Sequence, residues 1–383
     1  MMEEPIYLDH NATTPVDRRV LEKMLPYFCE VYGNAASIDH LHGHKAKQAV
    51  DEARQTTAKL LGGRKESEII FTSGATESNN LALIGVYRKF RDKGNHIISS
   101  AIEHPAVLDT LTYLKSEGAE ITLLPVDSYG TVDLEVLEKA IKKETILISV
   151  MFANNEIGTI QPIKEIGALA KSKGIIFHTD AAQAAGHEKI NVYDMNIDLL
   201  SFSAHKFYGP KGIGGLFVRS YSPLIKLIPI SYGGGHEKGM RSGTLNVPGI
   251  VGMAEALLVA NKEMPKENKQ LKDAADLICQ KLQQSFPDIK LNGHPHNRLA
   301  HNLSLTIPGV EAKALIHHLK NKLSFSSGSA CSTVKVAPSH VLNAIGLNDE
   351  ESFHTIRLGL GRFTSNSQQI VEIITSGIHN LKL

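Results

Sequence analysis

Hydrophobic positions along the chain follow two spacings, one typical of helices and one typical of buried strands. Between residues 44 and 61 the apolar positions recur at steps of four and three and stop at Gly62-Gly63, which predicts an amphipathic helix. Later apolar runs are too short for helices, and most are rich in Ile and Val, which favours strands buried on both faces: 68–71, 96–100, 146–152, 175–178 and 199–203. Helical patterns separate these runs, so we expect an α/β fold with a mostly parallel sheet covered by helices.

The pattern changes after about residue 260. Apolar residues at helical spacing predict one more amphipathic helix, namely Leu271, Ala275, Ile278 and Leu282. In residues 302–308, Leu and Ile alternate with Ser304 and Thr306, which predicts a half-exposed strand of a smaller α+β unit. We therefore expect a large α/β domain followed by a smaller C-terminal one.

Composition narrows the class of protein. The 383 residues include 41 Lys and Arg against 40 Asp and Glu, and the formal net charge of +1 argues against binding nucleic acid or an anionic membrane through bulk charge. No run of about 18 apolar residues is present to span a bilayer, and the acidic N-terminus does not resemble a secretory signal. The three cysteines form no CxxC pair, so we expect a soluble, globular protein of the reducing cytoplasm.

Polar side chains follow each of the predicted strands of the large domain. The stretches are TSGATESNN (72–80), EHPAV (103–107), NNEIG (154–158), TDAAQ (179–183) and SAHKFYGPKG (203–212). Ligands of open α/β sheets bind beyond the carboxyl ends of the strands, so these stretches should meet at one edge of the sheet. We interpret this convergence as a functional site.

Residues of these stretches suggest chemistry, although each also has a plainer interpretation. Thr76 follows Gly74 where a helix begins, and exposed N–H groups there bind phosphate, but an ordinary helix cap would look the same. Asp180 ends a buried strand and needs a partner, either a structural ion pair or a protonated ring nitrogen. Lys206 is either a surface lysine or an amine that forms a Schiff base. His104 is either a core residue or a group that stacks on a ligand ring and moves protons.

Together these groups match the needs of pyridoxal phosphate. A lysine captures the aldehyde, a carboxylate pairs with the pyridinium nitrogen, a helix N-terminus binds the phosphate, and a flat ring stacks on the cofactor. The sequence contains neither GxxxxGK[ST] nor GxGxxG, which argues against a nucleoside triphosphatase or a dinucleotide enzyme.

The cysteines and histidines divide into core and site candidates. Cys29 and Cys279 fall in amphipathic helices, which favours small core hydrophobes. Cys331 lies in FSSGSACST, which has little to pack, so we expect it exposed on a mobile loop, as a thiolate nucleophile or as an incidental surface thiol. Histidines pair at 42/44, 294/296 and 317/318 without further Cys or carboxylate at metal-ligand spacing, so we expect no metal site.

The sequence resembles the NifS/IscS-type cysteine desulfurases, in the class-V aminotransferase branch of fold-type-I pyridoxal-phosphate enzymes. The resemblance is most specific in 201–219 and in SSGSACS (326–332), and it also covers 7–17, 33–37, 71–82, 103–109, 154–163, 178–186, 233–244 and 356–364. It implies a large domain over 16–260 with a mostly parallel seven-stranded sheet. It also implies a smaller α+β domain from 1–15 and 261–383 that carries a mobile Cys loop at about 324–337.

The resemblance implies a role for each site residue. Lys206 would form the Schiff base and later move the proton at the substrate α-carbon. Cys331 would attack the sulfur of bound L-cysteine, keep that sulfur as a persulfide and release L-alanine. Asn155 and Arg357 would bind the substrate carboxylate. The cofactor would be held by Asp180 at the pyridinium, Gln183 at the ring hydroxyl, His104 over the ring, and Asn155. Its phosphate would be held by Gly74, Ala75, Thr76, Ser203, His205 and, from the other subunit, Thr244.

Two departures from the family pattern concern sulfur acceptors rather than the chemistry. The family's usual Pro-Ser is Ala35-Ala36 here, and STVKVAPSH after Cys331 lacks the frequent LEPS. The resemblance implies a cytoplasmic homodimer that passes sulfur to an acceptor protein for iron–sulfur cluster assembly or thiolation, without membrane or direct nucleic-acid contact. A class-V aminotransferase, a selenocysteine lyase and a non-catalytic scaffold on the same fold stay open as alternatives.

Overall fold

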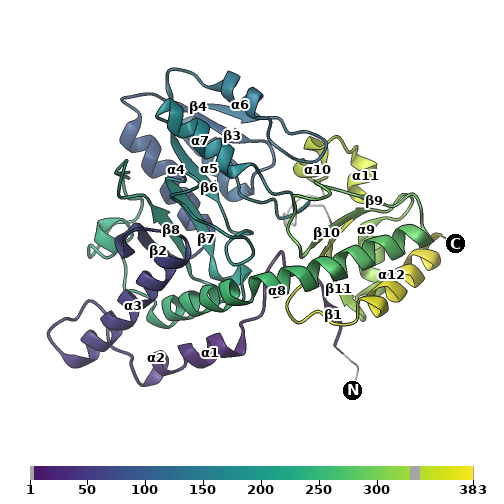
Figure 1. Cartoon of the computed structure of the whole chain (residues 1–383), viewed down its shortest axis with the longest axis horizontal. Helices are drawn as coiled ribbons and strands as arrows, with labels where there is room; N and C mark the ends of the chain where they lie inside the picture. Colours follow the sequence, from purple (N-terminus) through teal and green to yellow (C-terminus); the bar gives the residue numbers. More distant parts are fainter. Residues whose placement is uncertain (1–3, 328–336, 383) are drawn as a thin grey trace.

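A seven-stranded sheet forms the centre of the larger part of the molecule (Figure 1). The computed structural model describes residues 4–327 and 337–382. The strands lie in the order β2 (Ile69–Thr72), β8 (Gly214–Val218), β7 (Leu199–Ser203), β6 (Ile176–Asp180), β5 (Thr145–Ser149), β3 (His96–Ser100) and β4 (Glu120–Leu124). Within this sheet β8 runs antiparallel to both neighbours and the other pairs are parallel. The predicted α/β class with a mostly parallel seven-stranded sheet is confirmed.

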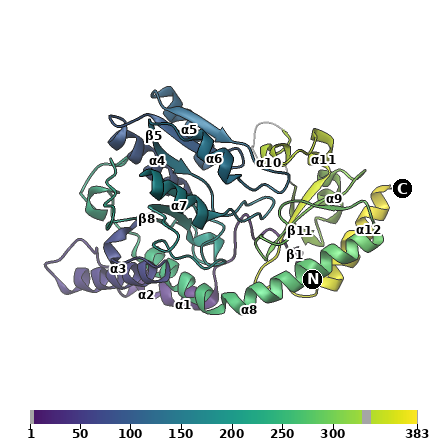
Figure 2. The same ribbon diagram turned by 45° about the horizontal axis from the view of Figure 1, so that its top comes forward.

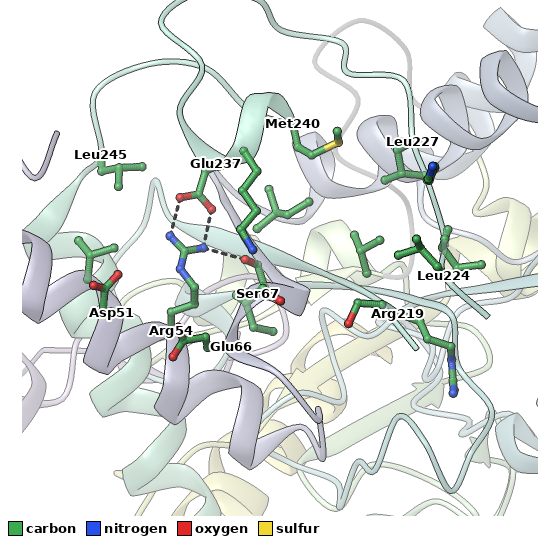
Figure 3. A pocket seen from close by; sticks show the side chains of 18 of the residues that line it. Asp51, Arg54, Glu66, Ser67, Arg219, Leu224, Leu227, Glu237, Met240 and Leu245 are labelled. Carbon is green, nitrogen blue, oxygen red and sulfur yellow. Dashed lines mark hydrogen bonds and ion pairs between the residues drawn. The ribbon is translucent and has the colours of Figure 1, made fainter. Parts of the chain in front are cut away.

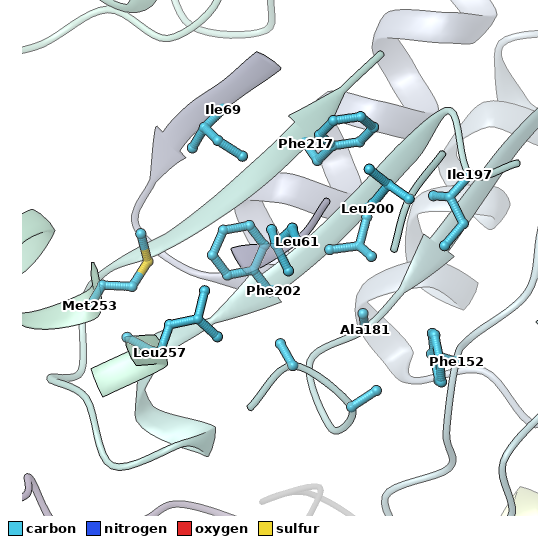
Figure 4. Close-up of a cluster of buried hydrophobic side chains, with 14 of the residues drawn as sticks. Leu61, Ile69, Phe152, Ala181, Ile197, Leu200, Phe202, Phe217, Met253 and Leu257 are labelled. Atoms are coloured by element: carbon cyan, nitrogen blue, oxygen red, sulfur yellow. The ribbon is translucent and has the colours of Figure 1, made fainter. Parts of the chain in front are cut away.

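Helices cover both faces of this sheet, because alternate strand residues point to opposite cores. Residues such as Ile70, Ile97 and Leu199 pack with α4 (Ala75–Phe90) and α5 (Pro105–Ser116) on one face. Their neighbours, such as Phe71 and Ile98, pack on the other face with α3 (Leu41–Leu60), α6 (Leu134–Ala140), α7 (Ile163–Lys173) and the start of α8 (Val247–Ser285). Figure 4 shows this second core, to which β7 contributes Leu200 and Phe202 and α8 contributes Met253 and Leu257.

A smaller antiparallel sheet organises the other part of the molecule. Its strands lie in the order β12 (Ser326–Ser327), β13 (Thr355–Gly359), β10 (Asn302–Thr306) and β9 (Lys290–Leu291). Their buried side chains pack with α9 (Ala312–Leu319), α12 (Ser367–Lys382) and the C-terminal half of α8. The N-terminal segment joins this core, since β1 (Ile6–Tyr7) pairs in parallel with β11 (Leu323–Ser324) and Leu8 is fully buried there. Figures 1 and 2 show α8 running along both parts.

Shorter elements connect these layers. They are α1 (Arg18–Met24), α2 (Pro26–Cys29), α10 (His340–Ala344), α11 (Asp349–Phe353) and 3₁₀ turns at Glu66–Glu68, Ala204–Lys206 and Glu237–Gly239. Local capping explains why α3 begins slightly earlier than predicted: Nδ1 of His40 accepts a hydrogen bond from the N–H of Gly43 at 3.1 Å. No helix in the described ranges combines the length and apolar character needed to cross a membrane.

Several predictions about packing are wrong. β10 is buried along its whole length rather than half-exposed, because Ser304 and Thr306 face the buried amide of Asn292, which donates to their hydroxyls at 3.3 Å and 2.9 Å. Cys29 is exposed at the end of α2, whereas Cys279 is buried in α8 as expected. The hydrophobic pattern also misses β4, which has exposed side chains at the sheet edge, and β8, which begins with two glycines.

The predicted domain boundary at residue 260 falls inside α8, a continuous helix of 39 residues. Residues of α8 as far as Ala260 join the core beside the large sheet, and those from Leu271 onward join the core of the small sheet. The helix therefore links the two cores without a break, and the division of the chain into 16–260 against 1–15 and 261–383 stays a prediction.

Candidate active site

A cavity of about 610 Å³ opens at the carboxyl ends of the central strands. The polar stretches that follow β2, β3, β5, β6 and β7 all contribute to its wall. The predicted site residues that line it are Gly74, Ala75, Thr76, His104, Asn155, Asp180, Gln183, Ser203, His205, Lys206 and Arg357. The fold thus brings together residues that are spread over much of the chain.

Lys206 ends the 3₁₀ turn that follows β7, and backbone carbonyls hold its ammonium group. Its Nζ donates to the carbonyl oxygens of Asn11 at 2.6 Å and Ala12 at 2.8 Å. Burial and the charge of Arg357 lower the pKa of Lys206 to about 8, against the opposing charges of Asp180 and Asp9. The neutral amine, which is the nucleophilic form, is therefore accessible near neutral pH.

Asp180 lies at the end of β6 in the wall of the same cavity and is 5% exposed. Its Oδ2 accepts a hydrogen bond from Nδ2 of Asn79 at 2.6 Å, and its Oδ1 accepts one from the N–H of Ala182 at 2.9 Å. Both donors are neutral, so they orient this buried carboxylate without neutralising its charge. A protonated ring nitrogen in the cavity would supply a positive partner.

The N-terminus of α4 and the end of β7 meet at one end of the cavity. Gly74 caps α4 with φ of 158°, and a Cβ atom there would lie 3.5 Å from the hydroxyl oxygen of Ser203. The first N–H groups of the helix, at Ala75 and Thr76, have no partner within the helix, and both residues line the cavity. This concentration of N–H and hydroxyl donors suits a phosphate group.

A glycine in the neighbouring strand allows the turn before α4 to approach the sheet. At Gly214 of β8, a Cβ atom would lie 2.5 Å from the carbonyl oxygen of Phe202 and 2.6 Å from Cα of Gly74. Any side chain there would push β8 and this turn apart, since real Cβ atoms do not approach backbone so closely. A residue of weak β-propensity is therefore present in β8 because it lets the turn at Gly74 pack against the strand beside the cavity.

Two histidines of the cavity are neutral at pH 7. Burial, together with nearby lysine charges, lowers the pKa of His205 to about 4, and its Nδ1 lies 3.1 Å from Oγ1 of Thr13. Burial also lowers the pKa of His104, whose Nδ1 caps α5 by accepting from the N–H of Ala106 at 3.1 Å. The neutral imidazole of His104 therefore carries its proton on Nε2.

Arg357 joins the wall of the cavity from β13 of the small sheet. Its Nη2 forms an ion pair with Oδ1 of Asp9 at 2.8 Å, and its Nη1 donates to the carbonyl oxygen of Asn155 at 3.1 Å. Its Nε is buried and has no hydrogen-bond partner within residues 4–327 and 337–382. The two Nη atoms therefore hold the guanidinium in place, while the side chain, 11% exposed, lines the cavity.

Two predicted site residues are not placed in this cavity. Thr244 is exposed, in the segment between the 3₁₀ turn at Glu237–Gly239 and α8. The adjacent Leu245 lines a second cavity of about 740 Å³, where Arg54 and Glu237 form a buried ion pair at 2.6 Å (Figure 3). Cys331 lies outside the described residues.

Comparison with known proteins agrees with this geometry. The family described as "Aminotransferase class-V" matches residues 6–371 of the chain. The chain belongs to the class-V aminotransferase family. Within it, the chain is 47% identical to "Cysteine desulfurase IscS" of Rickettsia bellii over 380 residues, which cover 99% of this chain and 92% of that relative. The resemblance to IscS-type desulfurases expected from the motifs is confirmed.

Solved structures of similar proteins share the fold of this class-V aminotransferase. A structure described as a "NIFS-LIKE PROTEIN" has a TM-score of 0.89 and 36% identity and covers 99% of this chain and 98% of its own. Another, described as "SspA in complex with cysteine", has a TM-score of 0.80 and 38% identity and covers 94% and 100%. The likeness therefore extends over both the large and the small sheet.

The N-terminal segment of residues 9–14 is the main part of the site to which the sequence analysis assigned no role. Besides its contact with Lys206, the carbonyl oxygen of Asn11 accepts a hydrogen bond from Nε2 of Gln183 at 2.9 Å. Asn79, which holds Asp180, was missed as well, although it lies one helical turn after Thr76 in α4. Spacing along α4 offered a signal for Asn79, whereas nothing in the hydrophobic pattern placed residues 9–14 beside the large sheet.

Proposed function

We propose that the protein is a pyridoxal-phosphate-dependent cysteine desulfurase that converts L-cysteine to L-alanine and takes the sulfur onto Cys331 as a persulfide. The observation that carries this proposal is the cavity whose wall brings Lys206, Asp180 and the N-terminus of α4 together with Arg357. The relatives described as cysteine desulfurases, and the similar structure described as a complex with cysteine, support the choice of reaction and substrate.

The residues of the cavity fit pyridoxal phosphate. The N–H groups at the start of α4, with Thr76 and Ser203, provide donors for the phosphate, and the absence of a side chain at Gly74 leaves room for it. Asp180, whose two donors are neutral, would pair with the pyridinium nitrogen, and His104 would lie against the ring. When bound, the cofactor withdraws electrons from the α-carbon of an amino-acid substrate.

The chain's own groups then account for the other needs of the reaction. The amine of Lys206, with its lowered pKa, would move the proton at the substrate α-carbon. Arg357 would bind the substrate carboxylate, together with Asn155. The thiolate of Cys331 would attack the substrate sulfur, so that an S–S bond forms and the C–S bond breaks. The β-carbon of the substrate gains a proton, and the product leaves as alanine. The reaction therefore balances without a further oxidant.

We include a homodimer and a sulfur acceptor in this proposal. Thr244 is exposed and outside the cavity of its own chain, which agrees with a phosphate contact made across a subunit interface. The resemblance to the NifS/IscS-type family supports delivery of sulfur to an acceptor protein for iron–sulfur assembly or thiolation, in the cytoplasm. A mixture of Lys206→Ala and Thr244→Ala chains should regain activity that either variant alone lacks, because one composite site would be intact.

The test of the reaction is turnover of L-cysteine with a reductant, with alanine and sulfide both measured. We expect equal yields from the wild type and loss of both in Cys331→Ala, while Cys29→Ala, a matched change at an exposed cysteine, keeps wild-type turnover. Turnover by Cys331→Ala equal to wild type would exclude the desulfurase. Selenide release from L-selenocysteine by that variant would then indicate a selenocysteine lyase, and amino transfer to a keto acid would indicate an aminotransferase.

A further inference from the structure

Asp9 belongs to the N-terminal segment but is fixed by the small sheet. The segment enters through β1, which pairs with β11, and Leu8 is buried in the core of the small sheet. Asp9 itself forms a parallel bridge with Gly359, two residues beyond Arg357 on β13. The backbones that carry Asp9 and Arg357 are therefore held side by side, independently of the ion pair between their side chains.

The guanidinium of Arg357 has two nitrogens committed to the protein and one that is not. Asp9 holds Nη2 at 2.8 Å and the carbonyl oxygen of Asn155 holds Nη1 at 3.1 Å, whereas the buried Nε has no partner among the described residues. The side chains of Arg357 and Asp9 are 11% and 21% exposed, so solvent screens their ion pair only partly. Because the guanidinium is planar, contacts at two of its nitrogens fix the orientation of the whole group.

We propose that Asp9 is a positioning residue that holds the guanidinium of Arg357 in the cavity wall, where it can bind the α-carboxylate of the substrate. The inference rests on the proposed function, because it takes an amino acid as the substrate. Asp9 touches neither the reacting atoms nor the carboxylate itself and acts through the guanidinium. Its removal should weaken binding of carboxylate ligands in particular and leave the grip of the cavity on the cofactor unchanged.

The opposite role is also testable at this ion pair. If Asp9 instead competed with the substrate carboxylate for Arg357, removing its charge would free the guanidinium and carboxylate ligands would bind more tightly. Arg357 is among the residues that line the cavity and Asp9 is not, which favours positioning over competition. The sign of the change in affinity separates the two roles.

The experiment measures binding of two probes to the cofactor-loaded, full-length protein by calorimetry. The probes are 3-mercaptopropionate, which is L-cysteine without its amine, and 3-mercaptopropionamide, in which a neutral amide replaces the carboxylate. In Asp9→Asn we expect Kd for the carboxylate probe to rise about tenfold, since one charge-assisted contact that fixes the guanidinium is lost. Kd for the amide probe and the visible absorbance band of the cofactor should not change.

A matched control and a double variant complete the test. Asp198→Asn removes the carboxylate of another buried Asp–Arg pair, with Arg219 at 2.9 Å, and should leave both probes at wild-type affinity. In an Arg357→Gln background, Asp9→Asn should add nothing, because the two residues act through one contact. Asp9→Gly should behave as Asp9→Asn does if the loss comes from the missing carboxylate rather than from the new amide.

Three results would overturn the positioning role: tighter binding of the carboxylate probe in Asp9→Asn, no change in its Kd, or equal losses for both probes. None of these measurements depends on sulfur transfer. Failure of the wild type to convert L-cysteine to alanine and sulfide would refute the proposed function, whereas the probe comparison would still report on Asp9. In steady-state assays of an active enzyme, Asp9→Asn should raise KM for L-cysteine more than it lowers kcat.

Discussion

Two groups of residues in the site, here called its two ends, are built in different ways. At one end, Asp180 and Lys206 and the N-terminus of α4 follow strands of a single sheet, and each strand supplies its functional residue at its own end. At the other end, Asp9, Asn155 and Arg357 come from the N-terminal segment, from the loop after β5 and from a strand of the small sheet. One end is set by neighbouring strands, the other by contacts between distant segments.

This difference suggests a division of labour. The strand ends are held by the hydrogen-bond ladder of the large sheet and by the cores on both of its faces, which suits a group that stays bound through many turnovers. The guanidinium of Arg357 is held by one ion pair and one carbonyl contact, which suits a ligand that comes and goes. Substitutions at the first end should affect the cofactor, and those at the second should affect the substrate.

The largest effect should come from Lys206→Ala. Without the amine that anchors the cofactor and moves the α-proton, we expect turnover to fall by about 10³-fold or more and the visible absorbance band of the cofactor to change. Lys189→Ala, at an exposed lysine, should leave both unchanged. A Lys206→Ala protein with wild-type turnover would refute the assignment of this end of the cavity to the cofactor.

A smaller and more selective effect should come from Arg357→Gln. Loss of the charge-assisted contact to the carboxylate should raise KM for L-cysteine by about 30- to 100-fold, as expected for about 2–3 kcal/mol. The cofactor band should be retained, because the strand ends are untouched. Arg18→Gln, at an arginine 91% exposed, is the control. Loss of the band in Arg357→Gln would show that the two ends are not independent.

The same contrast explains what could be predicted from the sequence. Asp180 and Lys206 were found because each directly follows a buried apolar run, and the rule for ligands at strand ends places them together. Residues 9–14 follow a strand of two residues, which has no readable period, and their place beside Lys206 depends on pairing with β11 and Gly359. Contacts of this kind are set by tertiary structure, and local pattern does not encode them.

The failure to predict β8 and the wrong exposure predicted for β10 have physical reasons of the same kind. In β8, Gly214 and Gly215 interrupt the apolar pattern because the turn at Gly74 lies against Gly214 and the ring of Phe202 lies against Gly215. In β10, the polar side chain of Ser304 predicts an exposed position, although it is buried and accepts a hydrogen bond from Asn292. Sequence patterns indicate the usual environment of a residue type. They fail where a polar side chain has a buried hydrogen-bond partner, or where a glycine is needed because another segment packs closely against it.

Asn79→Ala tests the cofactor end more finely. Asp180 would keep one donor, the N–H of Ala182, and lose the orientation that the amide of Asn79 gives its Oδ2. We expect the protein to retain pyridoxal phosphate about tenfold less tightly, measured by dialysis against free cofactor, with KM for L-cysteine within about twofold of wild type. Asn80→Ala is the matched control, since Nδ2 of Asn80 donates to the carbonyl oxygen of Thr76 in its own helix. Equal losses in both variants would mean that α4, rather than Asp180, had been disturbed.

The smallest effect should appear in the pH dependence of cofactor capture, and it connects the two ends. The neutral amine of Lys206 is the nucleophile and its pKa is lowered to about 8, so capture of pyridoxal phosphate by the cofactor-free protein should accelerate about tenfold per pH unit up to about pH 8 and level off above it. The negative charge of Asp9 raises the pKa of Lys206, whereas the positive charge of Arg357 lowers it. Asp9→Asn should therefore move the midpoint of this profile to lower pH, while Asp198→Asn should not move it. A midpoint that rises in Asp9→Asn would contradict the charge effect of this carboxylate on Lys206, because removing a negative charge can only favour the neutral amine.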